Sequence, residues 1–166
     1  MPNWTLNKLF VSGPREEIRA LKERVQVKDE KGKVIFPLTF VTIVPIPSRG
    51  KIERFYRPIR AAYKREHGRA LTADVRAIMW CADHWGTKWD AYECVLRRES
   101  RTSLLYIFDT AWSPPAEWVK QASLRFPRLR FCLHSWEDAI YKKEIHHIRN
   151  GKTAFFRASE LQAWSD

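Results

Sequence analysis

The chain has 166 residues, enough for one domain with its own core and too short for two typical domains. Its three cysteines, Cys81, Cys94 and Cys132, are odd in number and widely spaced, which favours reduced thiols over a disulfide framework. No stretch approaches the roughly 20 apolar residues of a spanning helix, and no basic head with an apolar run begins the chain. We therefore expect a soluble, cytoplasmic protein without a membrane partner.

Charge is the strongest signal in the composition. There are 30 Lys and Arg against 19 Asp and Glu, which gives a net charge of +11 and a pI near 9.9. This excess predicts a polyanionic partner such as nucleic acid or an acidic protein surface. The alternative is a solvated basic surface with no specific ligand. Eight basic residues gather in one segment: Arg49, Lys51, Arg54, Arg57, Arg60, Lys64, Arg65 and Arg69.

The first part of the chain predicts a strand, a helix and a second strand. Residues 4–13 are strand-like, and Pro14 is placed to begin a helix that runs to about Gln26. Glu16 and Glu17 fall in its first turn, where carboxylates meet the positive end of the helix dipole. Residues 36–47 are β-branched and aromatic and end in prolines, which predicts a buried strand.

Two helices are expected in the middle of the chain. Pro58 marks the start of the first and Gly68 its end. Thr72 is a good N-cap for the second, which Gly86 is placed to end. Because both helices lie between strands, they predict an insertion whose basic part covers residues 48–72.

The second half predicts strands at residues 88–96, 103–110 and 129–137, with a helix at about 113–126 before the last strand. Residues 141–158 predict a C-terminal hairpin that turns at Asn150 and Gly151, a pair suited to a type I′ turn. Together these elements predict one α+β domain over residues 1–166. It would be a ferredoxin-like sandwich with a mostly antiparallel sheet and helices on one face.

Two tryptophan-rich segments, "WCADHWGTKWDAY" at 80–92 and "FDTAWSPP" at 108–115, form a candidate structural motif. We expect Trp85 and Trp89 to pack near Trp112, with Lys88 and Asp90 or Asp109 joining the loops. Trp89→Ala should then cost about 3–5 kcal/mol of stability. The residues of this motif are Trp85, Gly86, Lys88, Trp89, Asp90, Asp109, Trp112 and Pro114.

Four segments in this order, "MPNWTLN", "FPLTFVTIVPIP", "WCADHWGTKWDAY" and "FDTAWSPP", resemble the YubB-like family of phage and conjugative-plasmid proteins. The resemblance touches most of the chain and is weaker in the basic helices and after about Tyr141. It implies a ferredoxin-like α+β fold and a mobile-element origin. The family brings no established reaction, so no catalytic residues are carried over.

Nucleic-acid binding is the hypothesis that these observations favour. The basic segment would follow a phosphate backbone, and one side of the sheet would be open for bases to stack. Strand alternation places Tyr106, Phe108, Arg130 and Trp136 on that side, unless the hairpin or the inserted helices cover it. We therefore expect a non-catalytic accessory protein that binds nucleic acid or a host nucleoprotein complex. Interference with a host defence system is an extension of the resemblance.

Two other function classes stay open at this stage. An inhibitor of the anti-CRISPR type would bind a host defence protein directly, without nucleic acid. An enzyme would use Lys88, Asp90 and Asp109, although an aspartate at a strand end more often caps a turn. Zinc binding by Cys81, His84, Cys132 and His134 is disfavoured, because the last two would face away from the helices. We expect no metal and no cofactor.

Overall fold

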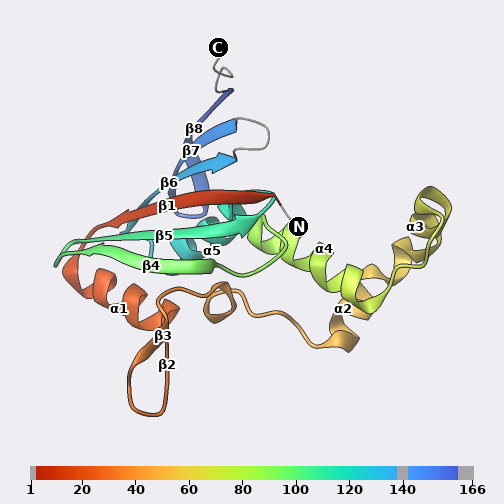
Figure 1. The fold of residues 1–166 in the computed structure, drawn as a ribbon, viewed down its shortest axis with the longest axis horizontal. Coiled ribbons are helices and arrows are strands. Elements are labelled where there is room, and N and C mark those ends of the chain that lie inside the picture. The colour runs from red at the N-terminus through yellow and green to blue at the C-terminus, as the bar shows by residue number, and fades with distance from the viewer. Residues whose placement is uncertain (1–2, 138–141, 161–166) are drawn as a thin grey trace.

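The computed structural model describes residues 3–137 and 142–160 and is built on a six-stranded sheet. The strands lie in the order β4-β5-β1-β6-β7-β8, and every neighbouring pair is antiparallel (Figure 1). They are β1 (Trp4–Ser12), β4 (Tyr92–Glu99), β5 (Ser103–Ala111), β6 (Arg130–Glu137), β7 (Lys142–Arg149) and β8 (Lys152–Glu160). Two shorter strands, β2 (Val27–Lys28) and β3 (Val34–Phe36), form a separate hairpin.

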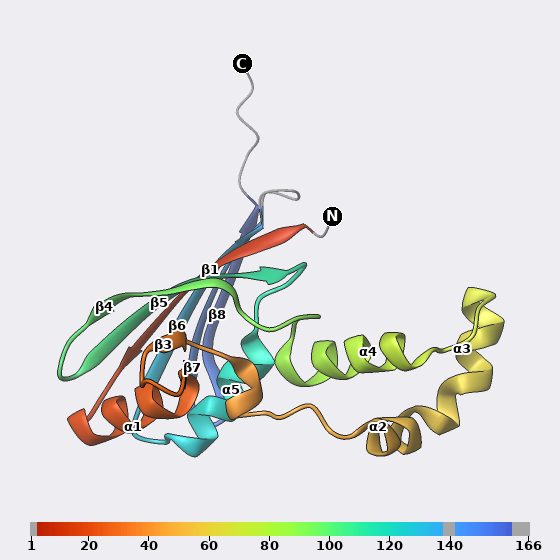
Figure 2. The same cartoon turned by 60° about the horizontal axis from the view of Figure 1, so that its bottom comes forward.

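The sheet domain has ferredoxin-like connectivity. β1, α1 (Arg15–Val25), β4, β5, α5 (Ala116–Arg125) and β6 follow the β-α-β-β-α-β order, and β1 lies between β5 and β6. Both helices cover the same face of the sheet (Figure 2). The predicted ferredoxin-like α+β fold is confirmed.

The core lies between the sheet and these two helices. Burial in β1 alternates strictly, so Leu9 and Val11 are buried while Leu6 and Phe10 are exposed. Helix α1 contributes Ile18, Leu21 and Val25 at helical spacing. Helix α5 contributes Trp118, Val119 and Ala122.

A long insertion separates α1 from β4. It contains the 3₁₀ turns η1 (Phe40–Thr42) and η2 (Arg57–Ile59) and the helices α2 (Arg49–Tyr56), α3 (Arg60–His67) and α4 (Ala73–Trp85). We call residues 48–72 the helical arm; with the start of α4 it projects away from the sheet (Figures 1 and 2). Its buried residues are Ile52, Tyr56 and Leu71, and Tyr56 Oη donates a hydrogen bond to Asp83 Oδ2 in α4 at 2.7 Å.

The predicted start of the first inserted helix at Pro58 is wrong. The chain is already helical from Arg49, and Pro58 sits in η2, which links α2 to α3. Proline at that position removes one backbone donor, which a short 3₁₀ turn between two helices tolerates. The predicted ends of the two helices agree with the structure: Gly68 has φ 66° and Gly86 has φ 85°, both left-handed. The Thr72 hydroxyl caps α4 by accepting from the Val75 amide at 3.3 Å.

The buried strand predicted at residues 36–47 is also wrong. Strand β3 ends at Phe36 and is exposed, and η1 follows a few residues later. Leu38, Phe40 and Ile43 are buried all the same, because this segment packs as irregular chain into the core instead of pairing with the sheet. Its apolar composition reflects burial without strand geometry, which composition does not distinguish.

The C-terminal hairpin forms β7 and β8 and extends the sheet beyond β6. Asn150 and Gly151 both have positive φ, 49° and 71°, which matches the predicted type I′ turn. Its predicted first residue, Tyr141, lies outside the described residues. Strand β4 begins at Tyr92, later than the predicted Lys88. In the described part of the chain, no helix combines the length and the apolar character needed to cross a membrane.

Candidate nucleic-acid interface

The helical arm carries the basic segment as exposed side chains. All eight predicted residues are exposed: Arg49, Lys51, Arg54, Arg57, Arg60, Lys64, Arg65 and Arg69. Arg60 is partly neutralised, because its Nη1 lies 2.9 Å from Glu53 Oε1. Glu53 is shared with Arg76, whose Nη2 is 2.5 Å from Oε2. Within residues 3–137 and 142–160, the other seven cations form no ion pair with a carboxylate.

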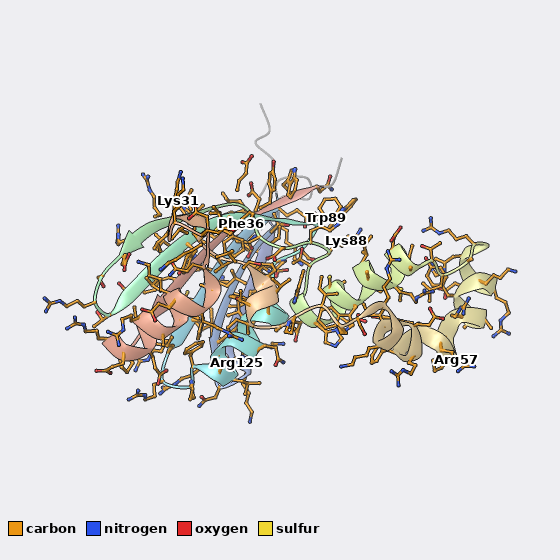
Figure 3. All side chains as sticks on the ribbon, turned by 90° about the horizontal axis from the view of Figure 1, so that it is seen from below. Lys31, Phe36, Arg57, Lys88, Trp89 and Arg125 are labelled. Carbon is orange, nitrogen blue, oxygen red and sulfur yellow. The ribbon has the colours of Figure 1, made fainter. Side chains whose placement is uncertain are left out.

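The arm therefore presents positive charge with little internal compensation. Glu53 and Glu66 are the acidic residues between positions 49 and 69, and Glu53 is held by its two arginines. In Figure 3, Arg57 stands out from the arm, far from Lys88 and Trp89 beside the sheet. Exposed guanidinium and ammonium groups on a projecting arm can contact phosphates without a preformed cavity.

A second surface is the open sheet face, which is the face opposite α1 and α5. Strand register defines it: Phe10 lies opposite Leu105 and Cys132, and Cys132 lies opposite His147. Its exposed aromatic and aliphatic residues are Trp4, Leu6, Phe10, Tyr92, Val95 and Phe155. Its basic residues on β1, β6, β7 and β8 include Lys8, Arg130, Lys143, Arg149 and Arg157.

Two residues predicted for this face are not on it. Tyr106 and Phe108 are each 1% exposed and belong to the core. The register explains this, because Tyr106 pairs with Leu9, which faces the helices. Arg130 and Trp136 do lie on the open sheet face, opposite Ser12 and Leu6 of β1.

Cations accompany the ring of Trp136 on the open sheet face. Lys8 Nζ lies 5.1 Å and Lys143 Nζ 5.4 Å from a ring centroid of this tryptophan, within the range of cation–π attraction. Further along the sheet, Trp4 stacks on Tyr92 with ring centroids 4.9 Å apart. Aromatic rings and cations therefore alternate on one exposed surface.

The open sheet face is hollowed near the C-terminal end of β1. The hollow has a volume of about 360 Å³. Two residues from each of β1, β6 and β7 line it on this face: Phe10, Ser12, Arg130, Cys132, His147 and Arg149. Sequence reasoning missed Phe10, His147 and Arg149, because Phe10 sits in the apolar run Leu9–Val11 and lies far from the other two residues in the chain. Strict alternation in β1 was the available signal for Phe10.

The tryptophan-rich motif does not form the predicted cluster. Trp85 is 2% exposed; its ring packs on Phe40 at 5.6 Å, and its Nε1 donates to the Val44 carbonyl at 2.9 Å. Trp89 and Trp112 are 46% and 45% exposed. Trp89 approaches Trp4 at 6.2 Å. The expected packing of Trp85 and Trp89 near Trp112 is wrong, because Gly86 turns the chain and separates the buried helix end from the exposed loop.

The charged residues of the motif have separate partners. Asp90 accepts from Thr39 Oγ1 at 2.5 Å and from the Phe40 amide at 2.6 Å, which ties the loop before β4 to η1. Lys88 Nζ lies 4.6 Å from the Trp112 ring. Asp109 is on the open sheet face opposite Tyr92, where burial raises its pKa, with a smaller contribution from Glu93. The three side chains proposed for catalysis thus engage different groups.

The cysteine and histidine pairs lie on different sides of the sheet. Cys81 is buried in α4, and burial raises its pKa to about 11. His84 stacks on Trp80 with ring centroids 4.2 Å apart. Cys132 and His134 lie on the open sheet face. Among the described residues, no three His, Cys, Asp or Glu side chains are grouped to hold a metal ion.

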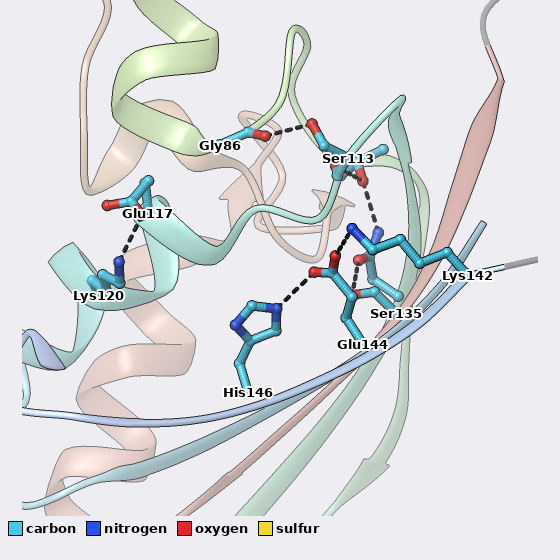
Figure 4. A network of polar contacts seen from close by, with 10 residues as sticks. Gly86, Ser113, Glu117, Lys120, Ser135, Lys142, Glu144 and His146 are labelled. Carbon is cyan, nitrogen blue, oxygen red and sulfur yellow. Dashed lines mark hydrogen bonds and ion pairs between the residues drawn. The ribbon is translucent and has the colours of Figure 1, made fainter. Parts of the chain in front are cut away.

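A buried polar network fixes the end of the sheet next to α5 (Figure 4). Asn7 is fully buried; its Nδ2 donates to Thr110 Oγ1 at 2.8 Å, and its Oδ1 accepts from Ser135 Oγ at 2.7 Å. Thr110 Oγ1 donates to the Ser113 carbonyl, and Ser113 Oγ donates to the Gly86 carbonyl at 2.6 Å. The network holds the loop before α5, which contains Pro114, against the end of α4.

The family model described as "Ferredoxin-like domain in Api92-like protein" matches residues 85–147. Over this part, the chain is similar to Api92-like proteins. It also resembles the crystal structure of a protein Api92 from Yersinia pseudotuberculosis, with a TM-score of 0.52, 11% identity and coverage of 100% of both chains. At this identity the likeness concerns the fold. No curated protein matches the sequence. These matches do not support the narrower YubB-like resemblance.

Proposed function

We propose that the protein binds nucleic acid, or a nucleoprotein complex, through its helical arm and without catalysis. The observation that carries this proposal is the set of seven exposed cations on the arm with no ion pair in the described structure. Such a surface attracts phosphates, and the release of their counterions supplies binding free energy.

The arrangement of the cations supports contacts along a backbone rather than at one point. Arg54 and Arg57 lie around the end of α2, while Lys64 and Arg65 lie about two to three helical turns further along in α3. Since α-helical residues rise about 1.5 Å each, these groups spread over several phosphates. The arm buries few of its own residues, so its charged surface is available on more than one side.

The biological setting follows from the YubB-like resemblance and belongs to the proposal. A phage or plasmid protein of this kind would act as an accessory factor that interferes with a host defence system by occupying its nucleic acid. Direct inhibition of a host defence protein is the competing function. Affinity capture from host lysate, with and without nuclease, separates the two: a partner retained after nuclease treatment favours the direct inhibitor.

Charge reversal on the arm tests the proposal. We choose Arg57, Lys64 and Arg65→Glu, because these residues are exposed and make no ion pair with another described residue, whereas Arg60 is held by Glu53. Fluorescence anisotropy with a labelled duplex should show binding weakened at least about 100-fold. The slope of log K against log salt should flatten by about 2.7, since each phosphate contact contributes about 0.9.

A control variant carries the same change in net charge elsewhere. Arg19, Arg24 and Arg97→Glu reverses three exposed cations on α1 and β4. If the arm contains the site, this variant should retain most of the wild-type affinity at 150 mM salt. Equal losses in both variants would show that net charge, and not the arm, determines binding. Unchanged affinity in the arm variant, with an unchanged melting temperature, would refute the proposal.

A further inference from the structure

The hollow at Phe10 points to a second contact on the other surface. We propose that the open sheet face binds single-stranded nucleic acid, with one base stacked on Phe10 in the hollow. This inference rests on the proposed function for the class of ligand, and it adds a second site and a preference for single strands.

The hollow has the features of a base-binding pocket. The Phe10 side chain is 40% exposed, although it lies in a central strand with both neighbouring strands in place. His147 lies on the same face, two strands away across Cys132. Two rings beside a volume of about 360 Å³, inside the about 300–1,000 Å³ range of ligand pockets, leave room for a nucleotide.

The charge around the hollow selects an anionic occupant. Arg130 and Arg149 line it, and none of its lining residues in the described part of the chain is acidic. A second copy of this chain, docked face to face about a twofold axis, would bring Arg130 and its neighbouring cations toward the same set in the partner. A polyanion with planar apolar groups fits both the rings and the cations, and nucleic acid is the polymer with this combination.

Contacts continue from the hollow along β1. Open-face residues of a strand are about 7 Å apart, so Phe10, Lys8 and Leu6 form a row. Lys8 in this row and Lys143 on β7 both lie near the ring of Trp136 on β6, and both are placed to meet phosphates. The open sheet face thus offers a stacking site for a base at Phe10, and its lysines can contact the phosphates of neighbouring nucleotides.

A single strand is favoured over a duplex because base faces in a duplex are covered by their neighbours. Stacking on Phe10 needs an exposed base face. The helical arm, in contrast, would contact phosphates of either form. The two surfaces therefore differ in the form of nucleic acid that each prefers.

The test is anisotropy with a labelled 12-nucleotide single strand and the matching duplex, at fixed salt. Phe10→Ala should weaken single-strand binding about 5- to 150-fold, the range for loss of one base–aromatic stack, and leave duplex binding unchanged. Phe10→Trp should restore the single-strand affinity. Phe36→Ala removes a phenylalanine of similar exposure from the β2–β3 hairpin beside α1, and it should have no effect.

The arm variant Arg57, Lys64 and Arg65→Glu separates this inference from the proposed function. Loss of duplex binding with a remaining single-strand affinity that still depends on Phe10 supports both. Single-strand binding that depends on Phe10, in a protein whose arm variant binds duplex normally, supports the sheet site and refutes the arm. Equal single-strand affinity of Phe10→Ala and the wild type overturns the inference. Concentration-dependent dimers that Phe10→Ala dissociates, seen by light scattering without nucleic acid, also overturn it, because a second copy then covers the face.

Discussion

Trp85 and Trp89 lie four positions apart in one motif and occupy opposite environments. Trp85 is 2% exposed and contacts Phe40, whereas Trp89 is 46% exposed in the loop after Gly86. We expect Trp85→Ala to cost about 3–5 kcal/mol of unfolding free energy, because it leaves a cavity in the core. Trp89→Ala should cost about 1–2 kcal/mol, because only part of its ring area is buried. Urea unfolding measures both changes in free energy. A larger cost for Trp89→Ala than for Trp85→Ala would contradict the assignment of Trp85 to the core.

A carboxylate in β7 makes stability depend on pH. Glu144 is 9% exposed, and a hydrogen bond from His146 and contact with Lys142 lower its pKa from 4.5 to about 2. A lowered pKa in the folded state means that the carboxylate stabilises the fold above pH 4.5, and that this contribution is lost as the pH falls toward 2. It amounts to about 3 kcal/mol.

Glu144→Gln removes this dependence. We expect the variant to be less stable than the wild type at pH 6, with the two curves converging as the pH falls below 4.5, as measured by urea unfolding across a pH series. Glu99→Gln is a control, since Glu99 is an exposed carboxylate paired with Lys22 at 2.8 Å on the surface. A constant gap between wild type and Glu144→Gln from pH 6 to pH 2 would contradict the assignment.

At the scale of elements, Gly86 at the end of α4 packs closely against the main chain at the start of α5. Its φ is 85°, and a Cβ there would lie 2.8 Å from the Pro114 carbonyl oxygen. Gly86→Ala should therefore cost more than about 2 kcal/mol, from the left-handed backbone and from a clash with main chain that cannot rotate away. Gly68→Ala is the matched control, because Gly68 also ends a helix with positive φ and a Cβ there would meet none of the described residues within 4 Å. Equal costs by thermal unfolding would show that the contact with Pro114 has no energetic weight.

The elements also show what sequence patterns can predict. Helix α4 was predictable because Thr72 and Gly86 mark its ends chemically, and the hairpin because Asn150 and Gly151 require a specific turn. The faces of β5 were not predictable. Residues 104–108 are apolar at every position, so no alternation distinguishes Tyr106 in the core from Leu105 on the open sheet face.

The two candidate sites also differ in how far the sequence alone could predict them. The helical arm is contiguous in sequence, so its cations were visible as a cluster. The hollow is assembled from β1, β6 and β7, whose neighbouring residues, such as Phe10 and Cys132, are brought together by strand register. The segment around Phe40 was misassigned because a buried irregular chain and a buried strand have the same composition.

At the scale of the whole molecule, two surfaces of different stability carry the positive charge. The open sheet face belongs to a six-stranded sheet with a packed core behind it. Helix α3 has no buried residue, so its stability depends on its neighbours in the helical arm. A surface held by few buried contacts opens locally more easily than a sheet core. Binding to the arm should therefore order it, while binding to the sheet should leave the strands unchanged.

Hydrogen–deuterium exchange measured by mass spectrometry tests this difference. Without ligand, amides of α3 should exchange well before those of β1 and β6, because α3 contributes no fully buried residue and only the half-buried Tyr63 packs against the core. Adding duplex should slow exchange in α2 and α3 and leave the β2–β3 hairpin unchanged, since the hairpin is exposed but lies outside both proposed surfaces. Protection of α3 equal to that of β1 in the free protein would contradict the local-stability argument. Slowed exchange confined to the hairpin would place the duplex on a surface that neither proposal contains.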